Sequence, residues 1–151
     1  MNFPILSSLI LLPTIGALFL LFSKDKNSNT GKYVALFTSF VNFLISIYLW
    51  YLFDSSTSSF QFVEDREWLK GFINYKVGID GISILFIVLT TLITPLCIIS
   101  VNNTIKNRLR DFLIAILVME SLMIGVFCSL DLVVFYLFFE AGLIPMFLII
   151  G

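Results

Sequence analysis

The sequence predicts an all-α membrane protein, a bundle of five transmembrane helices, and three observations lead to that fold class. Hydrophobic residues make up 59% of the 151 residues, 13% are charged, and the mean hydropathy is +1.04; in a soluble domain about a quarter of the residues are charged. Polar segments separate five long apolar runs. None of these runs alternates like a strand, and a helix satisfies its own backbone hydrogen bonds in lipid.

Each apolar run has about the length that a membrane-spanning helix requires. A hydrocarbon core of ~30 Å is crossed by ~20 helical residues. The runs cover about 3–22, 33–53, 79–101, 112–128 and 132–151. We therefore expect a single transmembrane helical region over 1–151, with an extramembrane loop at about 54–78.

The distribution of basic residues predicts how the bundle is oriented. The connections after the first and third runs hold six of the nine basic residues, namely Lys24, Lys26, Lys32, Lys106, Arg108 and Arg110. The connection over 54–78 is slightly acidic, and the one over 129–131 has no basic residue. Cytoplasmic loops of membrane proteins are enriched in lysine and arginine. The first and third connections are therefore expected in the cytoplasm, and the N-terminus outside.

Composition also indicates which partners and cofactors to expect. Nine basic residues nearly balance ten acidic ones, so no excess of positive charge favours nucleic acid. The chain has no histidine, the commonest metal ligand and the usual proton acceptor near neutral pH. It has neither a cysteine cluster nor a phosphate-binding loop. We expect the chain to lie in a lipid bilayer and to carry no metal, redox centre or cofactor itself.

Glu140 is the most informative residue because it lies nine residues into the uninterrupted apolar run from Leu132 to Gly151. A charged side chain near the centre of a membrane helix costs roughly 2.5–3.5 kcal/mol on insertion scales. Such residues face protein or water and often conduct ions or protons. A second carboxylate, Glu120, lies at a comparable depth in the preceding run. Both are candidate proton-pathway residues.

The turn between the last two runs allows the depth of both carboxylates to be predicted. Glu120 and Glu140 are each ten residues from Leu130. At 1.5 Å per residue this is ~15 Å, about half of a ~30 Å core. The two groups should therefore lie near the middle of the membrane, but the spacing leaves open whether they face each other.

Neighbouring residues can support proton exchange at Glu140. Tyr136, one turn earlier, can donate a hydrogen bond to it, and Pro145 leaves the carbonyl of Ala141 without its usual donor. A kink there can open a small hydrated space. Burial disfavours an ionised carboxylate, whereas an approaching lysine favours it, so a moving partner charge can drive proton binding and release. The structural alternative is that each glutamate is neutral or hydrogen-bonded to serine or threonine as helix–helix contact.

Other polar residues in the runs are explained by packing. Thr38, Asn42 and Ser46 form one stripe, and Ser121, Gly125 and Ser129 form a stripe of small residues; both predict helix–helix contacts. Asp80, just before the third run, has the position of an N-cap. Capping alone and a supporting role at the site explain the position of Asp80 equally well.

Three segments resemble a known family. Val133-Val-Phe-Tyr-Leu-Phe-Phe-Glu140-Ala-Gly-Leu-Ile-Pro145 resembles the fifth transmembrane helix of the chain M family of NADH–quinone oxidoreductase (respiratory complex I). The others are Val77-Gly-Ile-Asp80-Gly-Ile-Ser83, which leads into Leu89-Thr-Thr-Leu-Ile-Thr-Pro95, and Glu120-Ser-Leu-Met-Ile-Gly125. They occur in the family's order and spacing over residues 76–151. The first two runs are only generically similar.

The resemblance implies an antiporter-like, proton-translocating subunit that couples quinone reduction elsewhere in the complex to proton movement. It implies that Glu140 is an essential member of the proton pathway, paired with a lysine on a later helix, and that the residue matching Glu120 varies more. NADH, flavin, iron–sulfur clusters and quinone are expected in other subunits. Expected partners are other membrane subunits of complex I, especially adjacent antiporter-like ones, in a bacterial plasma membrane or mitochondrial inner membrane.

Members of this family have about fourteen helices, so we interpret the chain as an N-terminal fragment or a truncated reading frame. A cation/proton antiporter subunit is the nearest alternative function, since it shares the fold and the buried glutamate. A structural membrane fragment without transport is the third. The sequence downstream of Gly151 would distinguish the third from the first two.

Overall fold

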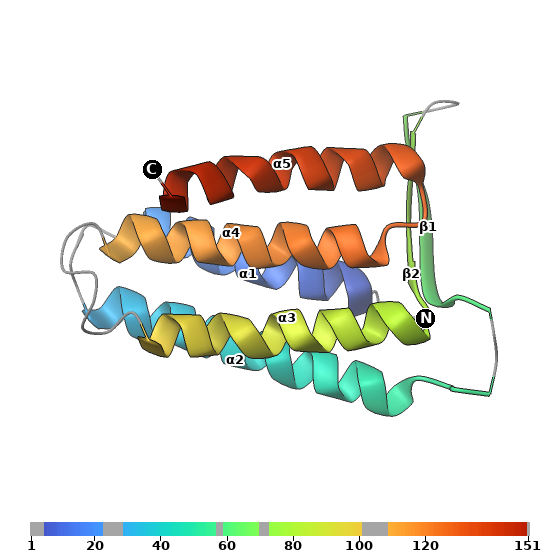
Figure 1. Ribbon diagram of the computed structural model, residues 1–151, viewed down its shortest axis with the longest axis horizontal. Coiled ribbons are helices and arrows are strands. Elements are labelled where there is room, and N and C mark those ends of the chain that lie inside the picture. The colour runs from blue at the N-terminus through green and yellow to red at the C-terminus, as the bar shows by residue number, and fades with distance from the viewer. Residues whose placement is uncertain (1–4, 23–28, 57–58, 70–72, 101–108, 151) are drawn as a thin grey trace.

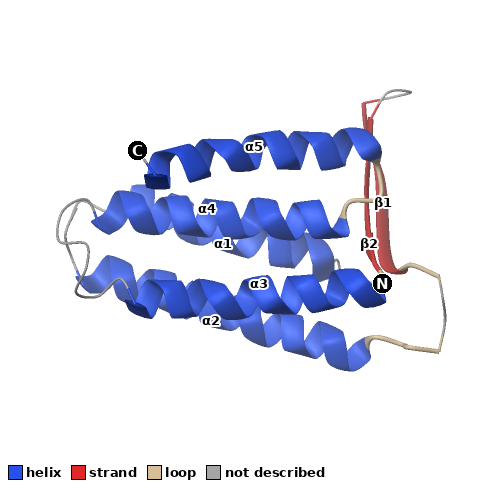
Figure 2. Ribbon diagram, viewed as in Figure 1, coloured by secondary structure: helices blue, strands red, loops and turns tan. Residues whose placement is uncertain are grey.

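The computed structural model describes residues 5–22, 29–56, 59–69, 73–100 and 109–150 (Figure 1). It contains five helices and one antiparallel pair of strands. The elements are α1 (Ile5–Leu21), α2 (Asn29–Leu52), β1 (Gln61–Leu69), β2 (Ile73–Ile79), α3 (Gly81–Ser100), α4 (Leu109–Cys128) and α5 (Leu132–Ile150). The helices lie side by side, and the strands cross one end of the bundle (Figure 2).

The predicted helical bundle is confirmed. In the described residues, α2, α3, α4 and α5 are long and apolar enough to cross a membrane, and α1 is a shorter apolar helix of 17 residues. Spanning helices range over about 17–25 residues, so α1 is at the lower end. α2 and α4 begin at Asn29 and Leu109, before the predicted 33 and 112, because the helices continue past their apolar runs into polar residues.

The connection at 54–78, predicted as an extramembrane loop, contains a hairpin of β1 and β2 (Figure 2). The pairing is irregular at two places, between Gln61 and Glu64 and between Glu67 and Leu69. The hairpin packs against the helix ends, where Val77 and Ile79 are fully buried. Ile79 therefore ends a strand, although we expected it to begin the third helix, and α3 starts only after Asp80.

The arrangement of helix ends agrees with the alternating topology predicted from the basic residues. The C-terminal ends of α1 and α3 and the N-terminal ends of α2 and α4 lie at the end of the bundle opposite the strands (Figure 1). Most of the basic connections, including Lys24, Lys26, Lys106 and Arg108, lie outside the described residues. The side of the membrane that this end faces stays a prediction.

Helix α4 is central, since it contacts α1, α2, α3 and α5. Two clusters of buried apolar residues surround it. The cluster near the strands contains Leu6, Leu9, Ile10, Leu49, Val77, Ile79, Ile84, Ile87, Ile124 and Cys128. The cluster toward the opposite end contains Ala17, Leu20, Ala35, Ile98, Leu113 and Leu117. On each of α1 to α4, the residues between these clusters are at mid-length, and several of them are polar.

Asp80 is the N-cap of α3, as its position predicted. Its Oδ1 accepts a hydrogen bond from the backbone N–H of Ser83 at 2.8 Å, and its carbonyl accepts one from the N–H of Ile84 at 3.1 Å. The hydrogen bonds from Ser83 hold the pKa of the Asp80 carboxyl below its usual value. The cap fixes where the strand ends and the membrane helix begins.

We expect Asp80→Ala to lower the stability of the full-length protein by about 1 kcal/mol, the usual contribution of an N-cap side chain. Asp80→Asn should stay close to wild type because asparagine caps equally well. Since folding lowers this pKa, the carboxylate's contribution is present at neutral pH and is lost as the pH falls below about 4. Thermal denaturation of wild type, Asp80→Ala and Asp80→Asn at pH 7 measures the differences in stability. Equal destabilisation by alanine and asparagine would contradict capping.

Candidate functional site

Polar side chains at mid-length of four helices, all buried except the half-buried Thr14, form what we call the polar layer. Its members are Thr14 of α1, Asn42 and Ser46 of α2, Thr91 and Thr94 of α3, and Glu120 and Ser121 of α4. Along the bundle, the layer lies between the two apolar clusters. Polar groups at such a position must find partners among themselves.

Glu120 is the ionisable residue of the polar layer. Its side chain is 2% exposed, and its Oε1 accepts a hydrogen bond of 2.7 Å from Nδ2 of Asn42, which is fully buried. Two oxygens in this contact, Oε2 of Glu120 and Oδ1 of Asn42, have no hydrogen-bond partner among the described residues. The pair joins α2 to α4 across the centre of the bundle.

The other members of the polar layer join the remaining helices. The hydroxyl of Thr14 donates to Oγ of Ser121 at 2.8 Å, and Ser121 in turn donates to the carbonyl of Ile10, which joins α1 to α4. Ser46 and Thr91 share a hydrogen bond of 2.7 Å between α2 and α3. These contacts confirm that the stripe on α2 and Ser121 serve helix–helix packing.

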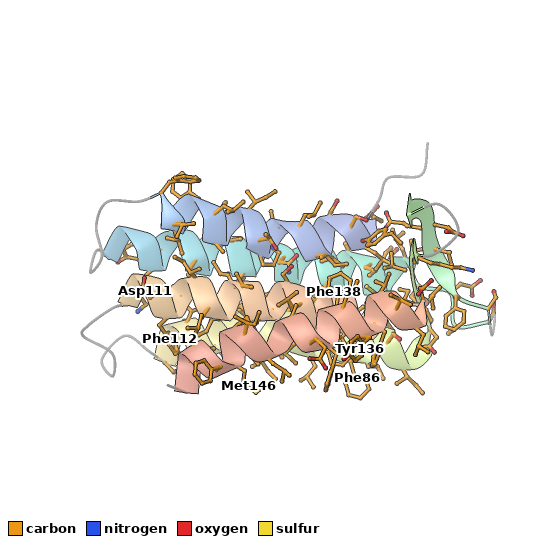
Figure 3. All side chains as sticks on the ribbon, turned by 90° about the horizontal axis from the view of Figure 1, so that it is seen from above. Phe86, Asp111, Phe112, Tyr136, Phe138 and Met146 are labelled. Carbon is orange, nitrogen blue, oxygen red and sulfur yellow. The ribbon has the colours of Figure 1, made fainter. Side chains whose placement is uncertain are left out.

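The stripe of small residues on α4 also has its predicted role. A Cβ atom at Gly125 would lie 2.7 Å from Cδ1 of Phe138 on α5, a residue labelled in Figure 3. Such a distance is far inside van der Waals contact. Glycine at this position therefore allows α5 to lie directly against α4.

Glu140 lies on α5, and in this chain its side chain is exposed. Only 11% of Leu132–Ile149 is buried, compared with 44% of Asp111–Cys128 in α4. The described structure therefore covers one narrow face of α5, and Glu140 lies outside that face. Glu120 points into the bundle and Glu140 away from its buried core, so the structure does not bring the two carboxylates together.

The suggested supporting residues of Glu140 lie on the same helix. Tyr136 is 60% exposed (Figure 3), and within the described ranges no hydrogen bond joins it to Glu140, so its supporting role stays a prediction. Pro145 is buried inside the continuous helix α5. A Cβ atom at Gly142 would meet nothing within 4 Å, so there is open space one turn from Pro145 and close to Glu140.

A groove of about 590 Å³ runs beside Glu120 between α3 and α4. Its walls are mostly apolar; the polar residues among them are Thr90, Thr94, Cys97, Ser100 and Glu120. In the part of the chain that the structure describes, no three histidine, cysteine, aspartate or glutamate side chains come close enough to hold a metal ion.

Comparison with known proteins agrees with these features. The family model of NADH-ubiquinone oxidoreductase chain 4, amino terminus, matches residues 7–129. The chain belongs to this family. The match covers α1 to α4, including Asn42 and Glu120, and ends just before α5.

Individual relatives extend the similarity through α5. The chain is 46% identical over 147 residues to NADH-ubiquinone oxidoreductase chain 4 of Marchantia polymorpha, covering 97% of this chain and 30% of the relative. It is 56% identical over 127 residues to NADH-quinone oxidoreductase subunit M of Rhodobacter capsulatus, covering 84% and 24%. It is 44% identical over 155 residues to subunit M of Rickettsia prowazekii, a match that covers 100% of this chain and 32% of the relative. The chain thus spans about 30% of the length of these relatives.

Sequence reasoning missed one residue of the site, Asn42. It was recognised as part of a packing stripe, but its hydrogen bond to Glu120 at 2.7 Å was not predicted. The available signal was chemical, because an asparagine at mid-length of an apolar helix needs a buried polar partner. Glu120 was the nearest candidate at the same depth on another helix.

Proposed function

We propose that this chain forms part of a proton-translocating membrane subunit of NADH–quinone oxidoreductase, which couples quinone reduction elsewhere in the complex to proton transport. One observation carries the proposal: a chain of the NADH-ubiquinone oxidoreductase chain 4 family has a carboxyl group, Glu140, at the middle of a membrane-spanning helix. A carboxyl group at that depth is costly to insert, and ionisable residues found there commonly belong to proton or ion pathways.

The exposed face of α5 fits a larger protein. An ionisable residue at mid-membrane faces protein or a water-filled cavity rather than acyl chains. The relatives are about three times as long as this chain, which is enough for further helices to cover α5. In the whole protein, Glu140 would then lie between α5 and these helices, where a lysine can approach it and change its proton affinity.

Other components of the reaction are assigned outside this chain. NADH, flavin, iron–sulfur clusters and quinone would bind to other subunits, and the direct partners would be neighbouring membrane subunits, antiporter-like ones in particular. The part played here is proton transfer by Glu140, with Glu120 as a second proton-binding group and Tyr136, Pro145 and Asp80 in support.

The alternative is a subunit of a cation/proton antiporter, which needs the same buried carboxylate but no redox partner. Affinity purification of the full-length protein from its native membrane separates the two functions. We expect it to copurify with a peripheral arm that oxidises NADH, and vesicles containing the complex to acidify when NADH is supplied. Copurification with antiporter subunits alone, and no NADH-driven proton movement, would refute the proposal.

A further inference from the structure

The contact between Asn42 and Glu120 leaves an imbalance of donors and acceptors. Nδ2 of Asn42 donates to Oε1 of Glu120 at 2.7 Å. The other oxygen of each group, Oδ1 of Asn42 and Oε2 of Glu120, is buried and has no partner. An ionised carboxylate only accepts hydrogen bonds, and so does an amide oxygen. With Glu120 ionised, two acceptors therefore remain unsatisfied in the centre of the bundle.

Neighbouring side chains do not supply the missing donor. The Thr94 hydroxyl lies within hydrogen-bonding reach of the Glu120 carboxyl group, but its proton is donated to the carbonyl of Thr90 at 3.0 Å, and a hydroxyl has a single proton. Ser121 donates to the carbonyl of Ile10. Both hydroxyl protons are therefore already in use.

The helices packed around Glu120 also lack a cation to balance a negative charge. α1 and α3 contain no charged residue at all. The charged residue of α2 is Lys32, ten residues before Asn42 and thus about 15 Å away along the helix. That of α5 is Glu140, which is exposed and acidic. On α4 itself, Arg110 and Asp111 lie at the far N-terminal end. Burial of an unpaired carboxylate is strongly unfavourable.

We propose that Glu120 carries a proton on Oε2 and donates it to Oδ1 of Asn42, so that the two side chains form a neutral, doubly hydrogen-bonded acid–amide pair. One proton satisfies both orphan oxygens, because Oε1 already accepts from Nδ2. No charge then remains at the site. The pair is a proton-binding site shared by α2 and α4, and Asn42 is the positioning residue that holds the proton on Glu120.

This site differs from Glu140 in what it does with its proton. The proton at Glu120 is part of helix packing, since its loss would leave two buried acceptor oxygens without a donor. Glu140 has no such partner among the described residues. The inference holds whether or not the protein pumps protons, so it stands separately from the proposed function.

Infrared spectroscopy of the full-length protein in its assembled complex tests the pair. The spectrum of wild type minus that of Glu120→Gln at pH 7 should contain the carbonyl band of a protonated carboxylic acid. Asn42→Leu should shift this band, because the acid loses its amide partner. Ser46→Ala, which removes the neighbouring contact with Thr91, should leave it in place. A difference spectrum with carboxylate bands alone would overturn the inference and would indicate an ionised Glu120 bridged to Asn42 by water.

Stability provides a second readout. Glutamine at 120 can donate to Oδ1 of Asn42 and accept from Nδ2, so Glu120→Gln should dissociate from the complex at the wild-type temperature. Asn42→Asp, which faces Glu120 with a second acid, should dissociate at lower temperature as the pH rises from 6 to 8, while wild type changes little. Destabilisation by Glu120→Gln, or no pH dependence in Asn42→Asp, would overturn the pair. Loss of pumping in Glu140→Gln does not enter this test.

Discussion

Glu140→Gln in the full-length protein is expected to lose nearly all NADH-driven proton pumping while the complex still assembles. Glutamine has the shape of glutamate but cannot take up or release a proton. Positioned acid–base groups contribute about 100-fold or more to proton-transfer rates, so the remaining flux should be near background. Assembly should be preserved because glutamine keeps the size and shape of the glutamate side chain and stays polar.

Inverted membrane vesicles provide the measurement, with proton uptake followed by a pH-sensitive dye and assembly by native electrophoresis. Tyr136→Phe is the matched control one turn away on α5, and it should reduce pumping far less. Glu120→Gln should also have the smaller effect, since glutamine keeps the contact with Asn42. Wild-type pumping by an assembled Glu140→Gln complex would remove Glu140 from the pathway, and a larger loss at Glu120 would reverse the ranking of the two residues.

Gly125→Val should abolish stable packing of α5 against α4. The added Cβ would lie 2.7–2.9 Å from three ring atoms of Phe138, and the ring cannot flex away as a long aliphatic chain does. Overpacking of a well-filled interface costs about 1–3 kcal/mol, and valine adds two more methyl groups. We expect little assembled protein in the membrane, measured as the fraction that comigrates with the complex.

Two further variants show whether the cause is this contact. Gly142→Ala on α5 should leave the contact between α4 and α5 intact, because among the described residues its Cβ would meet nothing within 4 Å. Phe138→Leu should partly restore assembly of Gly125→Ala, because it removes the ring that the new methyl group strikes. Equal losses in Gly125→Ala and Gly142→Ala, or no rescue by Phe138→Leu, would contradict the close approach of α4 and α5 at Gly125.

The helices of this fold could be predicted because apolar length alone determines them in a membrane. Hydropathy does not report on the hairpin over 61–79, whose first strand contains Glu64, Asp65, Arg66 and Glu67 in succession. That strand is formed by pairing with β2 and by contacts at the helix ends. Ser7 of α1 donates its N–H and its hydroxyl to Oε2 of Glu64, at 3.0 and 2.9 Å. Contacts between residues 57 positions apart are not visible in a local pattern.

The sequence predicted how deep in the membrane the two glutamates lie, but not which way their side chains point. Equal distances from Leu130 place Glu120 and Glu140 at one level, and both helices have the expected length. Helix rotation depends on side-chain packing, such as that of Gly125 on Phe138, which turns Glu120 inward and leaves Glu140 outward. Asn42 was interpreted as packing alone because its stripe with Thr38 and Ser46 explained its spacing.

Spin labelling at position 140 tests most directly whether this carboxyl group is enclosed in protein at the middle of the membrane. A nitroxide is attached to Glu140→Cys in the assembled complex, with Asp131→Cys at the α4–α5 turn and Phe147→Cys, 74% exposed on α5, as references. We predict that the label at 140 is shielded from a relaxing agent in water, unlike position 131, and is immobilised by surrounding protein. A label that meets the aqueous agent as readily as at 131, or moves freely among acyl chains, would contradict the proton-transfer role of Glu140.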